Sequence, residues 1–241
     1  MVPAGEFWMG RTRLYLMDEI GWNLRERMDD RPVHRVVLPS FAIGAHEVTN
    51  AEYARFVAQP GAGVSPPFHW GGATPPPAKA RQPVYNVSWF DAAKYCASVG
   101  GRLPTEAEWE RAARADTADL DYPWGNDFVD AAATTPAAGR RAHSGGSTGP
   151  MPVGSFAANG FGLFDVSGNL WEWTADWYDL HYYSQSPVQS PTGPPAGRYK
   201  VIRGGSWADN ETRLLTVYYR NFTDPDTAQP TIGFRCVRPA P

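Results

Sequence analysis

The chain has 241 residues and a formal charge of -3, with 22 basic and 25 acidic side chains. Both signs are spread along the chain, so no basic stripe follows a phosphate backbone, and nucleic acid is excluded as an expected partner. No run of about 18 apolar residues could cross a membrane, and the N-terminal segment lacks the pattern of a signal peptide. We therefore expect no membrane partner and a cytoplasmic location, or export if a leader has been removed.

Ten Trp, 23 Pro and 24 Gly residues indicate a chain with little regular secondary structure. Pro and Gly interrupt helices, whereas a loop-rich fold stiffened by large aromatic side chains tolerates both. We expect modest helix content, short strands and long ordered loops. The two cysteines, Cys96 and Cys236, are too few for a disulfide scaffold or a four-cysteine zinc site.

Three capping motifs predict helix starts, at Thr49, Ser88 and Thr105. In each, a hydroxyl side chain can accept a hydrogen bond from a backbone N–H three residues later, where an acidic side chain reaches back. The predicted helices span residues 49 to about 58, 88 to 100, and 105 to about 115. Helical spacing in the second places Cys96 on its buried face.

Short β-branched or aromatic segments bounded by turn residues predict strands at 7–10, 35–38, 41–43, 199–203 and 233–237. Residues 65–83, 131–150 and 184–197 are rich in Pro, Gly, Ser, Thr or Ala, which predicts loops. No composition shift marks a domain boundary. We therefore predict a single α+β domain over residues 1–241.

Several segments occur in an order that identifies a family. They read VPAGEFWMG, HEVTNAEYARF, GGRLPTEAEWERAAR, NGFGLFDVSGNLWEWTADWY, VIRGGSWAD and YRNFTDPDTAQPTIGFRC. Together they cover essentially the whole chain and resemble the formylglycine-generating enzymes, also called sulfatase-modifying factors. The resemblance implies a C-type-lectin-like fold in which the terminal strands lie close together, helices pack beside a small twisted sheet, and long loops build one face.

The resemblance places the two copper-binding cysteines of the enzymes at Asp209 and Leu214, three and eight residues beyond Ser206. Copper(I) prefers thiolate ligands, which aspartate and leucine do not replace. No cysteine lies between Cys96 and Cys236, so no shift of the comparison restores the site. We expect no copper site of the family type and no copper-dependent oxidation of cysteine to formylglycine.

A second segment resembles the calcium loop of the family, in which backbone carbonyls and a glutamate bind the ion. The matching residues are Ser167, Gly168, Asn169, Leu170 and Glu172. Calcium takes six or more oxygen ligands, which such a loop supplies. The alternative is that Glu172 only pairs with a buried arginine. A second calcium loop of the family needs an acid that the stretch between Ala131 and Phe164 lacks, so we expect that site to be absent.

Cys96 and Cys236 match positions where related proteins carry a disulfide between a helix and the last strand. They would form that bond in an oxidising compartment, or two adjacent buried thiols in the cytoplasm. We also expect Arg203 and Arg235, which lie in predicted strands, to pair with buried acids, for which the candidates are Asp165, Glu106 and Asp226.

The turn after the strand VIR is the predicted functional site, because Trp173 and Ser206 match positions that line the substrate groove of the enzymes. Aromatic side chains there would give a peptide, protein or small molecule a rigid apolar floor. The predicted ligand-binding residues are Trp173, Ser206, Trp207, Asp209, Arg213 and Tyr218. Ser206, Asp209 and Tyr218 are the candidates for catalysis by acid–base or radical chemistry.

Three functions remain open at this point. The first is an oxidoreductase acting on a peptide, thiol or amine through a non-thiolate site whose redox metal is unknown. The second is a lectin-like module that binds a ligand without turnover, as in the variable proteins of diversity-generating retroelements. The third is a subunit like a sulfoxide synthase that needs the iron-binding domain of a partner. The lost cysteines favour the second.

Overall fold

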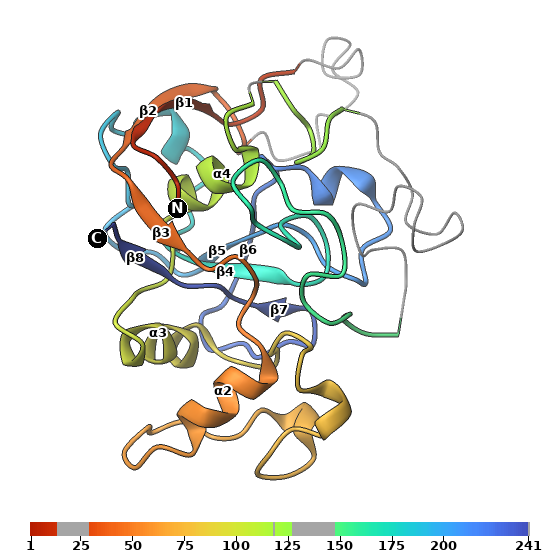
Figure 1. The fold of residues 1–241 in the computed structure, drawn as a ribbon. Coiled ribbons are helices and arrows are strands. Elements are labelled where there is room, and N and C mark those ends of the chain that lie inside the picture. Colours follow the sequence, from red (N-terminus) through yellow and green to blue (C-terminus); the bar gives the residue numbers. More distant parts are fainter. Residues whose placement is uncertain (14–28, 118, 127–147, 241) are drawn as a thin grey trace.

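The computed structural model describes residues 1–13, 29–117, 119–126 and 148–240. Figure 1 shows their arrangement. The three predicted helix starts are confirmed. α2 (Asn50–Val57) and α4 (Glu106–Arg114) each begin with a complete capping box. α3 (Trp89–Ser98) begins after Ser88, whose hydroxyl accepts a hydrogen bond from the backbone N–H of Asp91.

Eight strands form three small sheets within the described residues. β1 (Gly5–Met9) pairs antiparallel with β2 (His34–Leu38), and β3 (Phe41–Ile43) pairs antiparallel with β8 (Val237–Pro239). The third sheet has the order β6 (Asn221–Thr223), β5 (Lys200–Arg203), β4 (Trp171–Trp177) and β7 (Ile232–Gly233). β7 runs parallel to β4, while β5 is antiparallel to both β4 and β6.

The two ends of the chain lie on the same side of the molecule, as Figure 1 shows. Near the N-terminus, Val2 forms a β-bridge with Phe41 of β3. β3 in turn pairs with β8 close to the C-terminus. This pairing agrees with the expectation that the terminal strands lie close together.

The strand pattern differs from the sequence-based prediction at β4, β6 and the C-terminal strand. β4 lacks a polar–apolar alternation because Trp171, Glu172 and Trp173 are all buried, as in a central strand covered on both faces. The predicted strand at 233–237 is two strands, β7 and β8, because the chain leaves the four-stranded sheet and continues beside β3.

The predicted loops contain only short 3-10 helices where they are described. These are η1 (Phe68–Trp70) and η2 (Pro77–Lys79) in the first loop, with η3 (Tyr182–Ser184) ending where the third loop begins. A further one, η4 (Thr212–Leu215), follows β5. Most of the predicted loop at 131–150, up to residue 147, lies outside the described residues.

Two hydrophobic clusters divide the core. One lies where α4 packs beside β1 to β3, and Trp109 of α4 is its largest fully buried side chain. The other joins α2 and α3 to the four-stranded sheet, with Tyr53 and Trp173 at its centre. The disulfide between Cys96 and Cys236, with a Cα–Cα distance of 5.5 Å, ties α3 to the segment that enters β8. The predicted contact between the two cysteines is therefore confirmed.

α4 is buried along its whole length, charged residues included. Glu106 accepts hydrogen bonds from Arg203 at 2.9 Å and from Arg220 at 2.7 Å. Glu110 binds Arg203 and also Arg114, the latter at 2.9 Å. Burial alone would raise the pKa of Glu110, but the charges of Arg114 and Arg203 outweigh it and lower that pKa. The predicted pairing of Arg203 with Glu106 is confirmed.

The start of α4 receives one further acid from the sheet. Asp176 of β4 accepts a hydrogen bond from the backbone N–H of Glu106 at 2.8 Å. Burial, with the nearby charge of Glu106 adding, raises the pKa of Asp176 to about 8. Burial therefore favours the neutral form of Asp176 beside the acids of α4.

No helix among the described residues is long and apolar enough to cross a membrane.

Replacing Glu110 with Gln should lower the free energy of unfolding by about 3–5 kcal/mol, because Arg203 and Arg114 would stay buried with a charge partner lost. Urea denaturation measures this value. The matched control is Glu6→Gln, which breaks an exposed pair with Arg35 and should cost at most about 1 kcal/mol. Similar losses for both variants would contradict the prediction that the buried ion pairs contribute more to the free energy of unfolding than an exposed pair does.

Candidate functional site

β5 ends in a turn formed by Gly204, Gly205 and Ser206. Both glycines have positive φ angles, of 98° and 76°. A Cβ atom on Gly205 would collide with the side chain of Leu215 and lie 2.9 Å from the carbonyl oxygen of Leu214. The turn therefore needs glycine for its backbone conformation and for this close approach. The turn thus lies close to the segment that contains Leu214 and Leu215.

Asp209 closes this turn. Its Oδ2 atom accepts hydrogen bonds from the backbone N–H and from the hydroxyl of Ser206, both at 2.7 Å. Ser206 is only 1% exposed, whereas Asp209 is half-buried. Asp209, at the position that the resemblance assigns to the first copper-binding cysteine, therefore stabilises the turn, as short polar side chains commonly do beside their own backbone. The predicted neighbourhood of Ser206 and Asp209 is found in the structure.

We use the name loop face for three side chains that follow the turn in the sequence and are exposed or half-buried, Trp207, Arg213 and Tyr219. Trp207 is half-buried and donates its indole N–H to the carbonyl oxygen of Pro230 at 3.2 Å. The guanidinium of Arg213 lies 5.7 Å from the ring centre of Tyr219 and also binds the exposed Glu211 at 2.8 Å. The loop face thus combines two aromatic rings with a cation.

Four of the six predicted ligand-binding residues are not on this surface. Ser206 and Asp209 form the turn itself, and the other two are buried elsewhere. Trp173 is fully buried and donates its indole N–H to the carbonyl oxygen of Val87 at 3.1 Å, because β4 is covered on both faces. Tyr218 is 4% exposed, and its hydroxyl donates to Asp121 at 3.0 Å. The next residue, Tyr219, is half-buried and belongs to the loop face instead. The sequence shows two adjacent tyrosines after the turn, but it does not determine which of the two side chains points outward.

The second position of the copper-binding pair is also filled by a structural residue. Leu214 is partly buried and packs against the hydrophobic cluster of α2, α3 and the four-stranded sheet. Neither cysteine of the chain has a free thiol, because the two are bonded to each other. Asp209 thus accepts hydrogen bonds within the turn, and Leu214 packs against the core.

In the predicted calcium loop, Glu172 pairs with a buried arginine. Its two carboxylate oxygens accept hydrogen bonds from Arg235, both at 2.7 Å, and one also accepts from the indole of Trp109 at 3.0 Å. This is the alternative role considered for Glu172, and Arg235 pairs with it rather than with the acids named from the sequence. Asn169 and Ser167 also have side-chain partners in the protein.

Two further acids, Glu47 and Asp165, lie in the same buried region as Glu172 and Arg235. Burial raises the pKa of Asp165 and raises that of Glu47 well above its ordinary range, with the charges of Asp165 and Glu172 adding to the effect on Glu47. One oxygen of Asp165, Oδ1, is buried without a hydrogen-bond partner in the protein. Three carboxylates therefore share one arginine, and an added proton or cation would balance their charge.

The side chains of Ser167, Asn169 and Glu172 are thus already engaged within the protein. In the part of the chain that the structure describes, no three His, Cys, Asp or Glu side chains converge to hold a metal ion. A calcium ion would need the backbone carbonyls of the loop for most of its ligands. Asp165, with its unpartnered buried oxygen, is the side chain that fits such an ion and was not among the predicted ligands.

Residues 1–240 match the family described as the sulfatase-modifying factor enzyme 1-like domain. The chain belongs to this family. A formylglycine-generating enzyme of Streptomyces coelicolor is 34% identical, over 99% of this chain and 88% of its own length. The inactive C-alpha-formylglycine-generating enzyme 2 of Mus musculus is 31% identical, over 99% of this chain and 85% of its own.

A relative of another kind is the serine/threonine-protein kinase Pkn1 of Chlamydia trachomatis. It is 33% identical over 87% of this chain, which spans only 35% of the length of that kinase. Family members therefore include proteins in which this region is one part of a longer chain.

Solved structures agree on the fold. PvdO from Pseudomonas aeruginosa superposes with a TM-score of 0.76 at 27% identity, covering 99% of this chain and 92% of its own. Variable protein 1 of Treponema denticola has the same TM-score at 23% identity, covering 99% and 94%, and shows the fold alone. The predicted C-type-lectin-like fold of mixed α and β structure with few helices is confirmed.

Proposed function

We propose that this chain is a ligand-binding member of the sulfatase-modifying factor family that does not carry out thiolate-dependent copper oxidation. The observation that carries the proposal is the bond between Cys96 and Cys236, which leaves no thiolate for copper(I) in a chain with two cysteines. The roles of Asp209 and Leu214 as a turn acceptor and a packing residue support it. A mouse relative whose name describes it as inactive is consistent with it.

The oxidoreductase alternative receives less support from the geometry. A catalytic acid, base or radical group has to reach the reacting atom, usually within hydrogen-bond distance. Among its three candidates, Ser206 and Asp209 bind each other, while the hydroxyl of Tyr218 is buried and binds Asp121. These side chains do not form one constellation at the loop face.

The ligand of the loop face is a peptide segment with an apolar side chain and an acid. Trp207 and Tyr219 offer rigid rings, which contribute large contact areas at low entropic cost. The pair of Arg213 with Glu211 is solvent-exposed on both sides, and exposed pairs are weak. Arg213 can therefore exchange Glu211 for a carboxylate of the ligand without a large penalty.

Peptides selected from a displayed random library against the wild-type protein should lose at least tenfold in affinity upon Trp207→Ala or Tyr219→Ala, about 1.4 kcal/mol. Fluorescence polarisation of labelled peptides measures the affinities. Phe68→Ala is the matched control, because Phe68 is 90% exposed on a different loop. Selected peptides that bind all variants equally would refute the assignment of the loop face.

Copper binding tests the loss of the oxidase chemistry. The double variant Asp209→Cys, Leu214→Cys should retain one copper(I) ion against a chromogenic chelator with ascorbate present, because it restores two soft ligands at the family positions. The wild-type protein and the Asp209→Ser, Leu214→Ser control should retain none. Copper retention by the wild type, or its conversion of a cysteine peptide to formylglycine in a mass spectrum, would contradict the proposal.

We also propose a structural calcium ion at the loop of residues 167–172. Asp165 would supply a side-chain oxygen beside Glu172, and the backbone carbonyls of the loop, including those of Gly168 and Leu170, would supply others. The supporting observation is the buried Oδ1 atom of Asp165 in a region where acids outnumber arginines. The ion would neutralise this surplus and stabilise the folded state.

Calcium should therefore raise the melting temperature of the wild-type protein, and EGTA should reverse the change. Asp165→Asn should weaken this response, because an amide oxygen can bind calcium but no longer neutralises its charge. The substitution keeps an oxygen to accept the hydrogen bond that Gly154 donates to Asp165. Differential scanning calorimetry with magnesium as the control ion measures the response, and an equal melting temperature with calcium and with EGTA would refute the site.

A further inference from the structure

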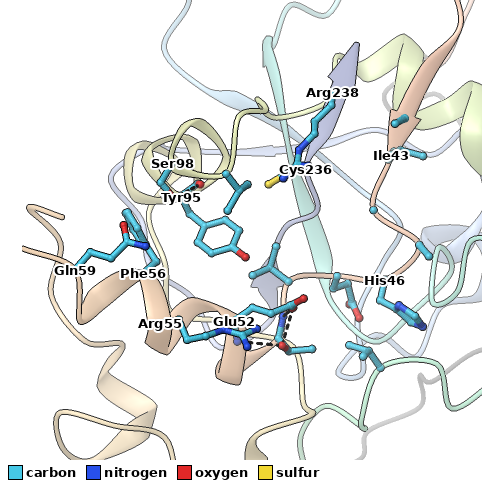
Figure 2. A pocket seen from close by; sticks show the side chains of 18 residues that line it. Ile43, His46, Glu52, Arg55, Phe56, Gln59, Tyr95, Ser98, Cys236 and Arg238 are labelled. Atoms are coloured by element: carbon cyan, nitrogen blue, oxygen red, sulfur yellow. Dashed lines mark hydrogen bonds between the residues drawn. The ribbon is translucent and has the colours of Figure 1, made fainter. Parts of the chain in front are cut away.

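A pocket of about 680 Å³ lies between α2, α3, β3 and β8, as Figure 2 shows. It shares no residue with the loop face. Its apolar lining includes Ile43, Val48, Phe56 and Val99. A volume of this size accommodates a small organic molecule, since ligand pockets commonly enclose about 300–1,000 Å³.

The side chain of Tyr95 extends from α3 into this pocket. Its ring is held by three aromatic neighbours: it stacks on Tyr53 at 5.6 Å and meets Phe56 and Phe234 edge-on, both at 5.5 Å. Tyr95 is only 7% exposed, yet its hydroxyl has no hydrogen-bond partner among the described residues. The hydroxyl reaches the open space of the pocket, where it can donate a hydrogen bond to a bound molecule.

Two arginines line the same pocket from opposite sides, Arg55 on α2 and Arg238 on β8. Neither forms an ion pair with a described residue. The nearby acid, Glu52, is engaged at the start of α2, where its carboxylate accepts from the N–H and the hydroxyl of Thr49 at 2.8 and 2.7 Å. Glu47, the other acid in the lining, is fully buried and accepts hydrogen bonds from Asn169 and from the backbone N–H of Leu170. Both acids are thus engaged within the protein, whereas the two arginines can take up an anionic ligand.

The disulfide fixes the spacing of these groups. Cys96 directly follows Tyr95 in α3, and Cys236 lies two residues before Arg238. Cys236 itself lines the pocket. The bond between the cysteines thus ties the backbone of α3 next to Tyr95 to the segment that enters β8, so two walls of the pocket keep a set separation, and such preorganisation favours ligand binding.

We propose that this pocket binds a small organic carboxylate. Its carboxylate lies between Arg55 and Arg238 and accepts a hydrogen bond from the Tyr95 hydroxyl, and its apolar body packs against Phe56 and Val99. Arginine suits this role because its planar donor groups match the geometry of a carboxylate. The inference goes beyond the proposed function and does not depend on it, because the pocket and the loop face have separate residues.

Dansylglycine, an aromatic carboxylate whose fluorescence rises in an apolar site, tests the proposal. The wild-type protein should bind it at least tenfold more tightly than dansylglycine amide, which has the same body without the charge. Arg55→Gln and Arg238→Gln should each weaken binding of the carboxylate by about tenfold, which is about 1.4 kcal/mol. Tyr95→Phe keeps the packed ring and should weaken binding by a few-fold, as expected for one hydrogen bond.

Lys94→Gln is the matched control, because it removes one positive charge from the same helix at a residue that does not line the pocket. It should leave binding unchanged. Arg55 and Arg238 are exposed, so unchanged melting temperatures verify that their variants are folded. Equal affinity for acid and amide, equal loss in the Lys94 variant, or no binding of dansylglycine by the wild type at about 1 mM would overturn the proposal.

Discussion

The carboxylate of Glu106 binds two fully buried arginines, Arg203 and Arg220, and the position of the loop face depends on these bonds. Arg203 is the last residue of β5, so its ion pairs with α4 hold the strand where it enters the glycine turn. Removing water from such charges costs several kcal/mol for each, and the cost is offset only when every partner is present. The network therefore holds the end of β5, and with it the start of the glycine turn, against α4.

The turn at Ser206 shows how a family site can keep its architecture with different chemistry. The glycines bring the backbone close to residues 214 and 215, whatever side chains follow. Asp209 then serves as an acceptor for Ser206, and Leu214 joins the core. Because both substitutions are accommodated by local hydrogen bonding and packing, the scaffold does not require copper ligands to fold. Exposed aromatic and cationic groups remain beside the turn, and they suit binding of a peptide.

The disulfide has two consequences for function. It removes the thiolates that the oxidase chemistry of the family requires, and it connects the walls of the pocket that contains Tyr95. The loop face and this pocket lie on different elements: the loop face follows β5, whereas the pocket lies between α2, α3 and the β3–β8 pair. We therefore propose two separate ligand surfaces on one small fold, one suited to a peptide and one to a small carboxylate.

Local signals in the sequence determined the starts of α2, α3 and α4, because a capping side chain and its N–H partner are only three residues apart. The sequence also determined the absence of cysteine at positions 209 and 214 and, through long shared motifs, the family and its fold. Only the tertiary structure decided that Trp173 is covered, that Tyr219 rather than Tyr218 faces outward, and that distant acids gather around Arg235. The physical reason is that burial and charge pairing depend on contacts between segments far apart in the chain, which local patterns do not encode.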